Sequence, residues 1–114
     1  MNERTRKRLA SDIRHALADI LAREVSDDRL KNVNITRVKL SGDGSHMTLF
    51  YETLGDAEEK KESDNAMRSA RGFLRSQLAS RIRMRTVPDI SIVRDDSGEK
   101  GDRTLSILRD LSSD

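Results

Sequence analysis

The chain has 114 residues and a formal net charge of only +2, so it is long enough for one domain and its net charge alone identifies no partner. Hydrophobic residues make up 34% of it and charged residues 37%, against about 25% charged in an average domain, so we expect a small core. Cysteine is absent, which excludes disulfides and cysteine-liganded zinc. The sequence has no apolar run of about 18 residues and no recognisable secretory signal, so we expect a cytoplasmic protein with no membrane partner.

The first predicted element is a helix over residues 3–24. Apolar side chains recur along it at spacings of three and four, from Leu9 to Val25, as one buried helix face requires. It lacks aromatic residues and carries acids among its outward positions, which favours packing on a sheet over binding to a membrane surface. Its start carries a basic cluster made of Arg4, Arg6, Lys7 and Arg8.

Two strands joined by a turn are predicted next, after a polar break at 26–29. The first strand, over 33–40, is rich in β-branched residues, but its apolar alternation changes phase, and a bulge near Thr36 and Arg37 would restore it. A glycine-containing turn leads to the returning strand over 46–54. The two strands are therefore predicted to form a hairpin.

A second helix is predicted over residues 58–80, where apolar residues recur at the helical period. Gly72 lies in its middle, and glycine costs about 1 kcal/mol relative to alanine inside an exposed helix. A glycine at such a position indicates either a break in the helix or the close approach of another backbone. We therefore expect the helix to kink at Gly72 and then to resume.

The last predicted element of the domain is a strand over 90–93. Pro88 prevents the second helix from reaching it and favours extended backbone just before the strand. The order helix, strand, strand, kinked helix, strand predicts an α+β fold in which the helices cover one face of a three-stranded sheet. Residues 1–95 are expected to form this domain, and residues 96–114 a flexible tail with a short helix over 103–111.

Arginine dominates the second half of the second helix and the residues that follow it. No acidic residue lies between Asp64 and Asp89, although a solvated helix face normally carries both signs of charge. A helix that merely exposes arginines to solvent would give a similar pattern, but the single sign of charge and the choice of arginine favour a phosphate-binding surface. Its candidate residues are Arg68, Arg71, Arg75, Arg81, Arg83 and Arg85, with Arg4, Arg6, Lys7 and Arg8 as an auxiliary patch.

The sequence contains no recognisable set of residues with catalytic chemistry. His15 and His46 are each isolated from the partners that a metal site or a nucleophilic site requires. The glycines and the lysine at 97–101 lack the phosphate-loop pattern and the strand that precedes it. We therefore expect no enzyme activity, no cofactor and no metal.

A resemblance to a known family rests on the second helix and the residues after it. The run Ser-Ala-Arg-Gly-Phe-Leu-Arg-Ser-Gln-Leu at 69–78, followed by Val-Pro-Asp-Ile at 87–90, resembles the ribosome-binding factor A family. The resemblance extends over about residues 4–95 and includes the family's Ala-x-Gly kink motif, matched here by Ala70 and Gly72. In that family the motif replaces the G-x-x-G turn with which KH domains admit a nucleic-acid backbone.

The resemblance implies a type II KH-like fold in the order α-β-β-α-kink-α-β. It also implies a non-catalytic assembly factor that binds the free small (30S) ribosomal subunit and assists the maturation of its 16S rRNA at the 5′ end. The family is linked to growth in the cold. On this basis we expect a monomer whose partners are the small subunit and 16S rRNA.

Two alternative functions are also compatible with the sequence. A free-standing KH-like protein that binds single-stranded RNA would use the same arginines, and it would bind short oligonucleotides as tightly as small subunits. A protein-interaction module would use the first helix, with the arginines meeting acidic partners. Binding that survives nuclease digestion of the partner would indicate this second function.

Overall fold

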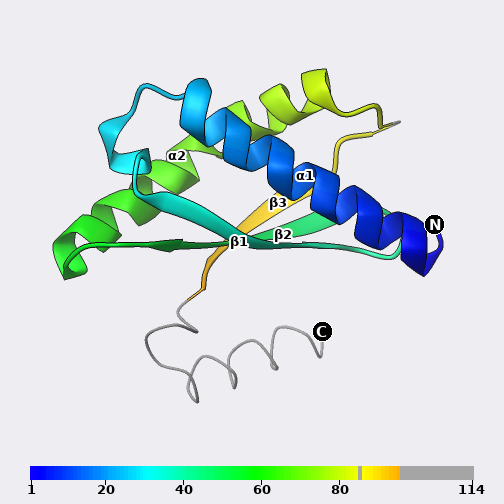
Figure 1. The fold of residues 1–114 in the computed structure, drawn as a ribbon, viewed down its shortest axis with the longest axis horizontal. Coiled ribbons are helices and arrows are strands. Elements are labelled where there is room, and N and C mark those ends of the chain that lie inside the picture. The colour runs from blue at the N-terminus through cyan, green and yellow to red at the C-terminus, as the bar shows by residue number, and fades with distance from the viewer. Residues whose placement is uncertain (85, 96–114) are drawn as a thin grey trace, which may run out of the picture.

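The sheet is the centre of the fold, and both long helices cover the same face of it (Figure 1). The computed structural model describes residues 1–84 and 86–95. Its elements are, in chain order, α1 (Glu3–Arg23), the 3-10 helix η1 (Asp28–Leu30), β1 (Val33–Leu40), β2 (His46–Thr53), α2 (Ala57–Arg81) and β3 (Asp89–Arg94). The strands lie in the order β1-β2-β3, with β1 antiparallel and β3 parallel to β2. This is the predicted α+β, type II KH-like arrangement.

Every helix and strand predicted for the described residues is present, and their ends agree to within one residue. The addition is η1, which forms where only a polar break was expected. Asp27 starts it by accepting a hydrogen bond from the backbone N–H of Arg29 at 3.0 Å. The predicted tail over 96–114, with its short helix, lies outside the described residues, as does Arg85.

Helix α1 packs on β1 through a stripe of aliphatic side chains. Asn2 caps its first turn by accepting a hydrogen bond from the backbone N–H of Thr5 at 2.8 Å. Ile13, Leu17 and Ile20 are fully buried at the predicted spacings, and burying each side chain contributes about 1.5–3 kcal/mol. The prediction that this helix packs on a sheet is confirmed.

The hairpin of β1 and β2 contains the predicted bulge. The register of the pair shifts between Ile35 and Arg37, so Thr36 is the extra residue. Because of this extra residue, Ile35 and Val38 both face the core although they are three positions apart. The hydroxyl of Thr36 donates to Oδ2 of Asp95 at 2.8 Å, just beyond the end of β3.

One carboxylate holds the turn between β1 and β2. Oδ1 of Asp43 accepts hydrogen bonds from the backbone N–H of Ser45 (3.0 Å), the hydroxyl of Ser45 (2.7 Å) and the hydroxyl of Ser41 (2.8 Å). These donors, the Ser45 amide foremost, lower the pKa of Asp43 to about 2 because they stabilise its charged form. Gly44 follows with a φ of 74°, a conformation that favours glycine. The turn therefore has a fixed shape.

We expect the folded turn to lose these hydrogen bonds as the pH falls through about 2, and their contribution to stability to decline between about pH 4 and pH 2. A carboxyl group whose pKa is lowered on folding contributes stability above its unfolded pKa, here 3.8, and that contribution is lost as the pH falls through its folded value of about 2. The chemical shift of the Ser45 amide proton should therefore titrate with a midpoint near pH 2. A midpoint near 3.8 would show that the folded turn does not hold this carboxylate.

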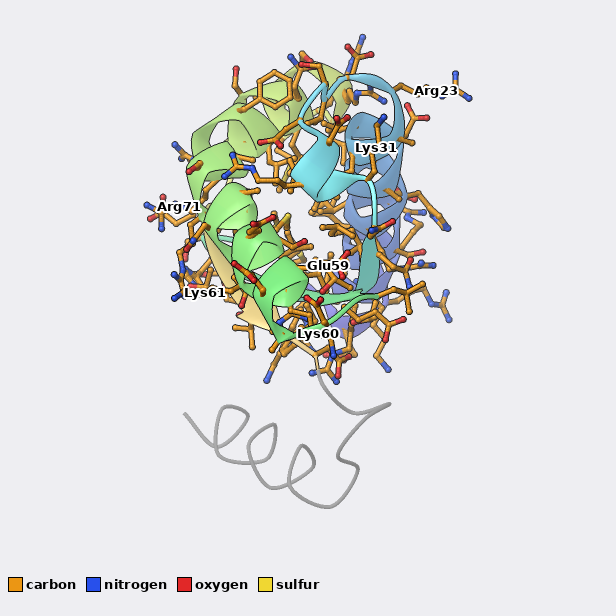
Figure 2. The ribbon with its side chains drawn as sticks, turned by 90° about the vertical axis from the view of Figure 1, so that its left-hand side faces the viewer. Arg23, Lys31, Glu59, Lys60, Lys61 and Arg71 are labelled. Carbon is orange, nitrogen blue, oxygen red and sulfur yellow. The ribbon has the colours of Figure 1, made fainter. Side chains whose placement is uncertain are left out.

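Helix α2 runs without interruption through Gly72. A capping box between Asp56 and Glu59 starts it, and the buried side chains of Met67 and Leu74 lie on either side of the glycine. Because these side chains hold both halves of the helix on the core, the cost of glycine, about 1 kcal/mol, does not break it. The helix was predicted to kink at Gly72 and to resume: it stays helical through this residue, and Figure 2 shows α2 changing direction along its length.

Asp64 joins α2 to the sheet. It accepts a hydrogen bond from the Tyr51 hydroxyl and two from Arg94, at 3.0 Å from Nε and 2.7 Å from Nη2. Nη2 of Arg94 also donates to the carbonyl oxygen of Lys60 at 3.0 Å. Burial and the hydrogen bond to Asp64 raise the pKa of Tyr51, so its hydroxyl stays protonated and continues to donate.

We expect Asp64→Ala to lower the free energy of unfolding by about 1–3 kcal/mol, because it leaves Tyr51 and Arg94 without their shared acceptor. Urea denaturation would show this as a lower midpoint at an unchanged slope. Asp12→Ala is the matched control, since Asp12 is an exposed helical residue with no hydrogen bond or ion pair to the described residues. Equal midpoints for the two variants would contradict the assignment.

Candidate nucleic-acid interface

One side of α2 gathers basic side chains. Arg68, Arg71 and Arg75 are three and four residues apart, which makes them neighbours on the helix surface. Lys61 continues the row two turns before Arg68. Figure 2 shows Lys61 and Arg71 on the same side of α2, away from α1. We call Lys61, Arg68, Arg71 and Arg75 the basic flank.

Arg68 and Arg71 are the most available arginines of the basic flank. Both are exposed, and within residues 1–84 and 86–95 neither makes a hydrogen bond or an ion pair. An arginine without an internal partner keeps its five N–H donors for another molecule. These two side chains therefore meet the first requirement for phosphate contacts.

Arg75 is hydrogen-bonded within the protein and also partly exposed to solvent. Its Nη2 donates to the carbonyl oxygen of Val87 at 2.9 Å, and its Nε to that of Pro88 at 3.3 Å. Nη2 also lies 3.7 Å from a carboxylate oxygen of Asp89. The side chain is still 46% exposed, so it fixes the start of β3 against α2 and leaves part of its guanidinium for a ligand.

Arg81 makes ion pairs within the protein. It donates to Asp19 at 2.5 Å and lies 3.4 Å from Glu24, so it joins the end of α2 to the end of α1. The hydrogen bond from Arg81 lowers the pKa of Asp19. A phosphate at this position would have to compete with two carboxylates for the same donors.

Arg83 lies in the connection from α2 to β3. It is exposed and makes no hydrogen bond or ion pair to any residue that the structure describes. Together with Arg75 it lines a hollow of about 620 Å³ between this connection and the β1–β2 turn. Two of the predicted arginines thus meet at one concave surface, while Arg85 lies outside the described residues.

The basic cluster of α1 divides in two. Arg6 donates to a backbone carbonyl at the end of β1 at 3.2 Å and also pairs with Glu3, and Nζ of Lys7 lies 3.8 Å from the same Glu3. Arg4 and Arg8 are exposed and have no such contact in the described part of the chain. Arg6 therefore fastens α1 to the sheet, whereas Arg4 and Arg8 are free to form an auxiliary patch.

Ala70 and Gly72, the kink motif of the resemblance, have different surroundings. Ala70 is partly buried and packs against the core. Gly72 is exposed, and apart from its chain neighbours and the adjacent helix backbone a Cβ built on it would meet no described heavy atom within 4 Å. Internal packing thus gives no reason for a glycine here, whereas the open space beside Arg71 would let the backbone of a partner come close.

Sequence reasoning missed two features of this surface. Lys61 lies seven residues before Arg68, so extending the helical period back into the acidic block would have found it. The hollow beside Arg75 brings together the start of α1, the β1–β2 turn and the residues before β3. No spacing in the sequence indicates that these segments meet.

The two histidines lie on different elements. Nε2 of His46 lies 2.9 Å from the hydroxyl of Ser91 across β2 and β3, and His15 is exposed on α1. Among the residues that the structure describes, no group of three or more His, Asp or Glu is placed to hold a metal ion. None of the described helices is long and apolar enough to cross a membrane.

Related proteins identify the family of this chain. The model of the ribosome-binding factor A family matches residues 5–108. The chain belongs to this family. It is 41% identical over 108 residues to ribosome-binding factor A of Carboxydothermus hydrogenoformans, covering 95% of this chain and 86% of that protein. It is 42% identical over 106 residues to the factor of Dictyoglomus thermophilum, covering 92% and 88% respectively.

Structures of the family have the same fold. The crystal structure of ribosome-binding factor A from Thermus thermophilus superposes with a TM-score of 0.69 at 28% identity, covering 78% of this chain and 93% of that one. A homology model of the Thermus thermophilus factor, fitted into a cryo-EM map of a 30S complex, gives a TM-score of 0.65 at 27% identity and covers 79% and 94%. The family resemblance and the KH-like fold predicted from the sequence are confirmed.

We expect Arg81→Gln to lower the urea midpoint of unfolding and Arg68→Gln to leave it unchanged. Both substitutions remove one positive charge from α2, but only Arg81 is paired with carboxylates of α1. The decrease in the urea midpoint caused by Arg81→Gln should be smaller at high salt, because salt screens exposed ion pairs. Equal midpoints for the two variants at low salt would contradict the structural role of Arg81.

Proposed function

We infer that this protein is a non-catalytic maturation factor that binds the free small (30S) ribosomal subunit and assists the processing of its 16S rRNA at the 5′ end. Membership of the ribosome-binding factor A family supports this, as does a structural relative whose coordinates were fitted into a 30S complex. The observation that carries the proposal is the pair Arg68 and Arg71, exposed and without an internal acid. RNA phosphates are the partner that unpaired arginines fit best.

The shape of the basic flank suits an RNA backbone. Its members are separated by about one or two helical turns, so they can contact several phosphates of one strand. Gly72 lies beside Arg71 and adds no side chain between the guanidinium groups and a strand that crosses them. We further propose that the factor acts as a monomer in the cytoplasm and requires no cofactor.

We expect the double variant Arg68→Glu and Arg71→Glu to lose at least about tenfold in affinity for purified 30S subunits, because a hydrogen bond to a charged group contributes about 1.5–3 kcal/mol. Binding should also depend less steeply on salt, since fewer counterions are released per complex. Co-sedimentation with 30S subunits over a series of salt concentrations measures both effects. The fold should be unchanged, because neither side chain makes a hydrogen bond or an ion pair to the described residues.

The matched control is Arg23→Glu with Lys31→Glu. It changes the net charge by the same amount on side chains that are 76% and 72% exposed. These side chains pair with Asp19 and Asp28 at the surface, where such ion pairs contribute little to stability. Figure 2 shows both on the side of α1, away from Arg71. Equal losses of 30S affinity in the two double variants would indicate a general charge effect and contradict the proposed flank.

Two further measurements separate the other functions. If the protein binds short single-stranded oligonucleotides as tightly as 30S subunits, it is a free-standing RNA-binding protein. If the protein still binds its partner after the RNA of that partner has been digested with nuclease, a protein partner is favoured.

A further inference from the structure

The hollow at the end of the basic flank has the chemistry of a nucleotide site. Three segments far apart in the chain form it: the start of α1, the β1–β2 turn and the connection from α2 to β3. Its volume of about 620 Å³ lies in the range of small-molecule sites. We call it the junction pocket, and the residues that matter here are Leu9, Asp43, Arg75, Arg83, Met84 and Val87.

One part of the junction pocket is apolar. Leu9, Met84 and Val87 line it while packing against the core, so each is partly buried and held in place. Aliphatic and thioether side chains offer a polarizable surface that makes no hydrogen-bonding demand. Such a surface suits the flat face of a base that has left the stack of its strand.

Hydrogen bonds hold the junction pocket in shape without a ligand. The two bonds from Arg75 to the carbonyl oxygens of Val87 and Pro88 fix the connection against α2. The backbone N–H of Asp89 donates to the carbonyl oxygen of Ser45 at 3.1 Å and joins β3 to the β1–β2 turn. A site that is already ordered loses little entropy when a ligand enters.

Asp43 offers the pocket an acceptor of fixed position. Its Oδ1 is saturated by three donors of the turn, whereas its Oδ2 accepts no hydrogen bond from the described residues. Like any aspartate with a pKa well below 7, this carboxylate is charged at neutral pH. The amino group of cytosine, adenine or guanine can donate to such an oxygen, but uracil carries a carbonyl where cytosine carries its amino group.

The charges of the pocket disfavour a bare phosphate as its ligand. Arg83 is exposed and has no partner in the described part of the chain, but the carboxylates of Asp43 and Asp89 also line the hollow. Asp89 lies 3.7 Å from Arg75 and partly offsets its charge. A ligand that brings hydrogen-bond donors together with its negative charge satisfies both kinds of group.

We propose that the junction pocket binds one unstacked RNA nucleotide, with its base against the apolar surface and its amino group donating to Asp43. Its phosphate then lies toward Arg83. Because Arg75 belongs to both the basic flank and the pocket, a strand that follows the flank leads to this site. The inference rests on the proposed function and adds a base preference to a surface that otherwise recognises phosphates.

Titration of the full chain with cytidine 5′-monophosphate and uridine 5′-monophosphate tests this, with backbone amide shifts as the readout. We expect shifts at Gly44, Ser45 and Met84, and a preference of about three- to tenfold for the cytidine nucleotide, the value of one hydrogen bond. Asp43→Asn keeps the Oδ1 acceptor that the turn requires and replaces Oδ2 with a donor, so it should abolish or reverse the preference. Asp12→Asn, the same change on an exposed residue of α1, should keep it.

Equal affinity for the two nucleotides, or no shifts at these amides, would overturn the proposal. The same shifts with inorganic phosphate alone would also overturn it, since they would show simple anion binding. The double variant Arg68→Glu and Arg71→Glu should retain the cytidine preference, because neither residue lines the pocket. If the wild-type protein binds 30S subunits but shows no preference for the cytidine nucleotide, the pocket alone is refuted. If the wild-type protein does not bind 30S subunits, the proposed function is refuted.

Discussion

The packing of both helices on one face of a three-stranded sheet is the constraint on which the rest of this structure depends. The chain is poor in hydrophobic residues, so α1 and α2 each supply one aliphatic stripe to a single core. On α2 that stripe includes Met67 and Leu74. Arginines at other positions of the helical period must therefore face solvent, and Arg68, Arg71 and Arg75 share one side. The position of the candidate RNA-binding residues is thus a consequence of how the core is packed.

The carboxylates of the protein decide which arginines are available. Asp19 and Glu24 engage Arg81, and Asp64 engages Arg94. No described acid pairs with Arg68 or Arg71. A guanidinium that already bonds a carboxylate gains little from a phosphate, because the phosphate must displace a partner of the same charge and similar geometry. A chain with a net charge of only +2 can therefore present a basic surface, since none of its described acids pairs with Arg68 or Arg71.

Local patterns predicted the elements because periodicity, capping and turn residues act within a few positions. The bulge at Thr36 was predictable as a change of phase in one strand. The partners of Arg81 were not, since they lie 62 and 57 residues away and no local pattern records which acid the end of a helix will meet. The junction pocket was hidden for the same reason. The sequence thus identified candidate arginines, but their availability depends on tertiary contacts.

The structure narrows the possible reasons for a glycine at position 72. A glycine inside a helix indicates a break or a close approach, and the uninterrupted α2 removes the first explanation. Close approach of another described segment is also removed, since apart from its chain neighbours and the adjacent helix backbone no described heavy atom lies within 4 Å of a Cβ built there. The described residues thus supply no contact that requires a small residue, which agrees with our proposal that this contact belongs to the complex. In the proposed complex, a larger side chain beside Arg71 would separate the guanidinium groups from the RNA backbone. In that proposed complex, binding of the partner would offset the cost of about 1 kcal/mol that glycine brings to an exposed helix.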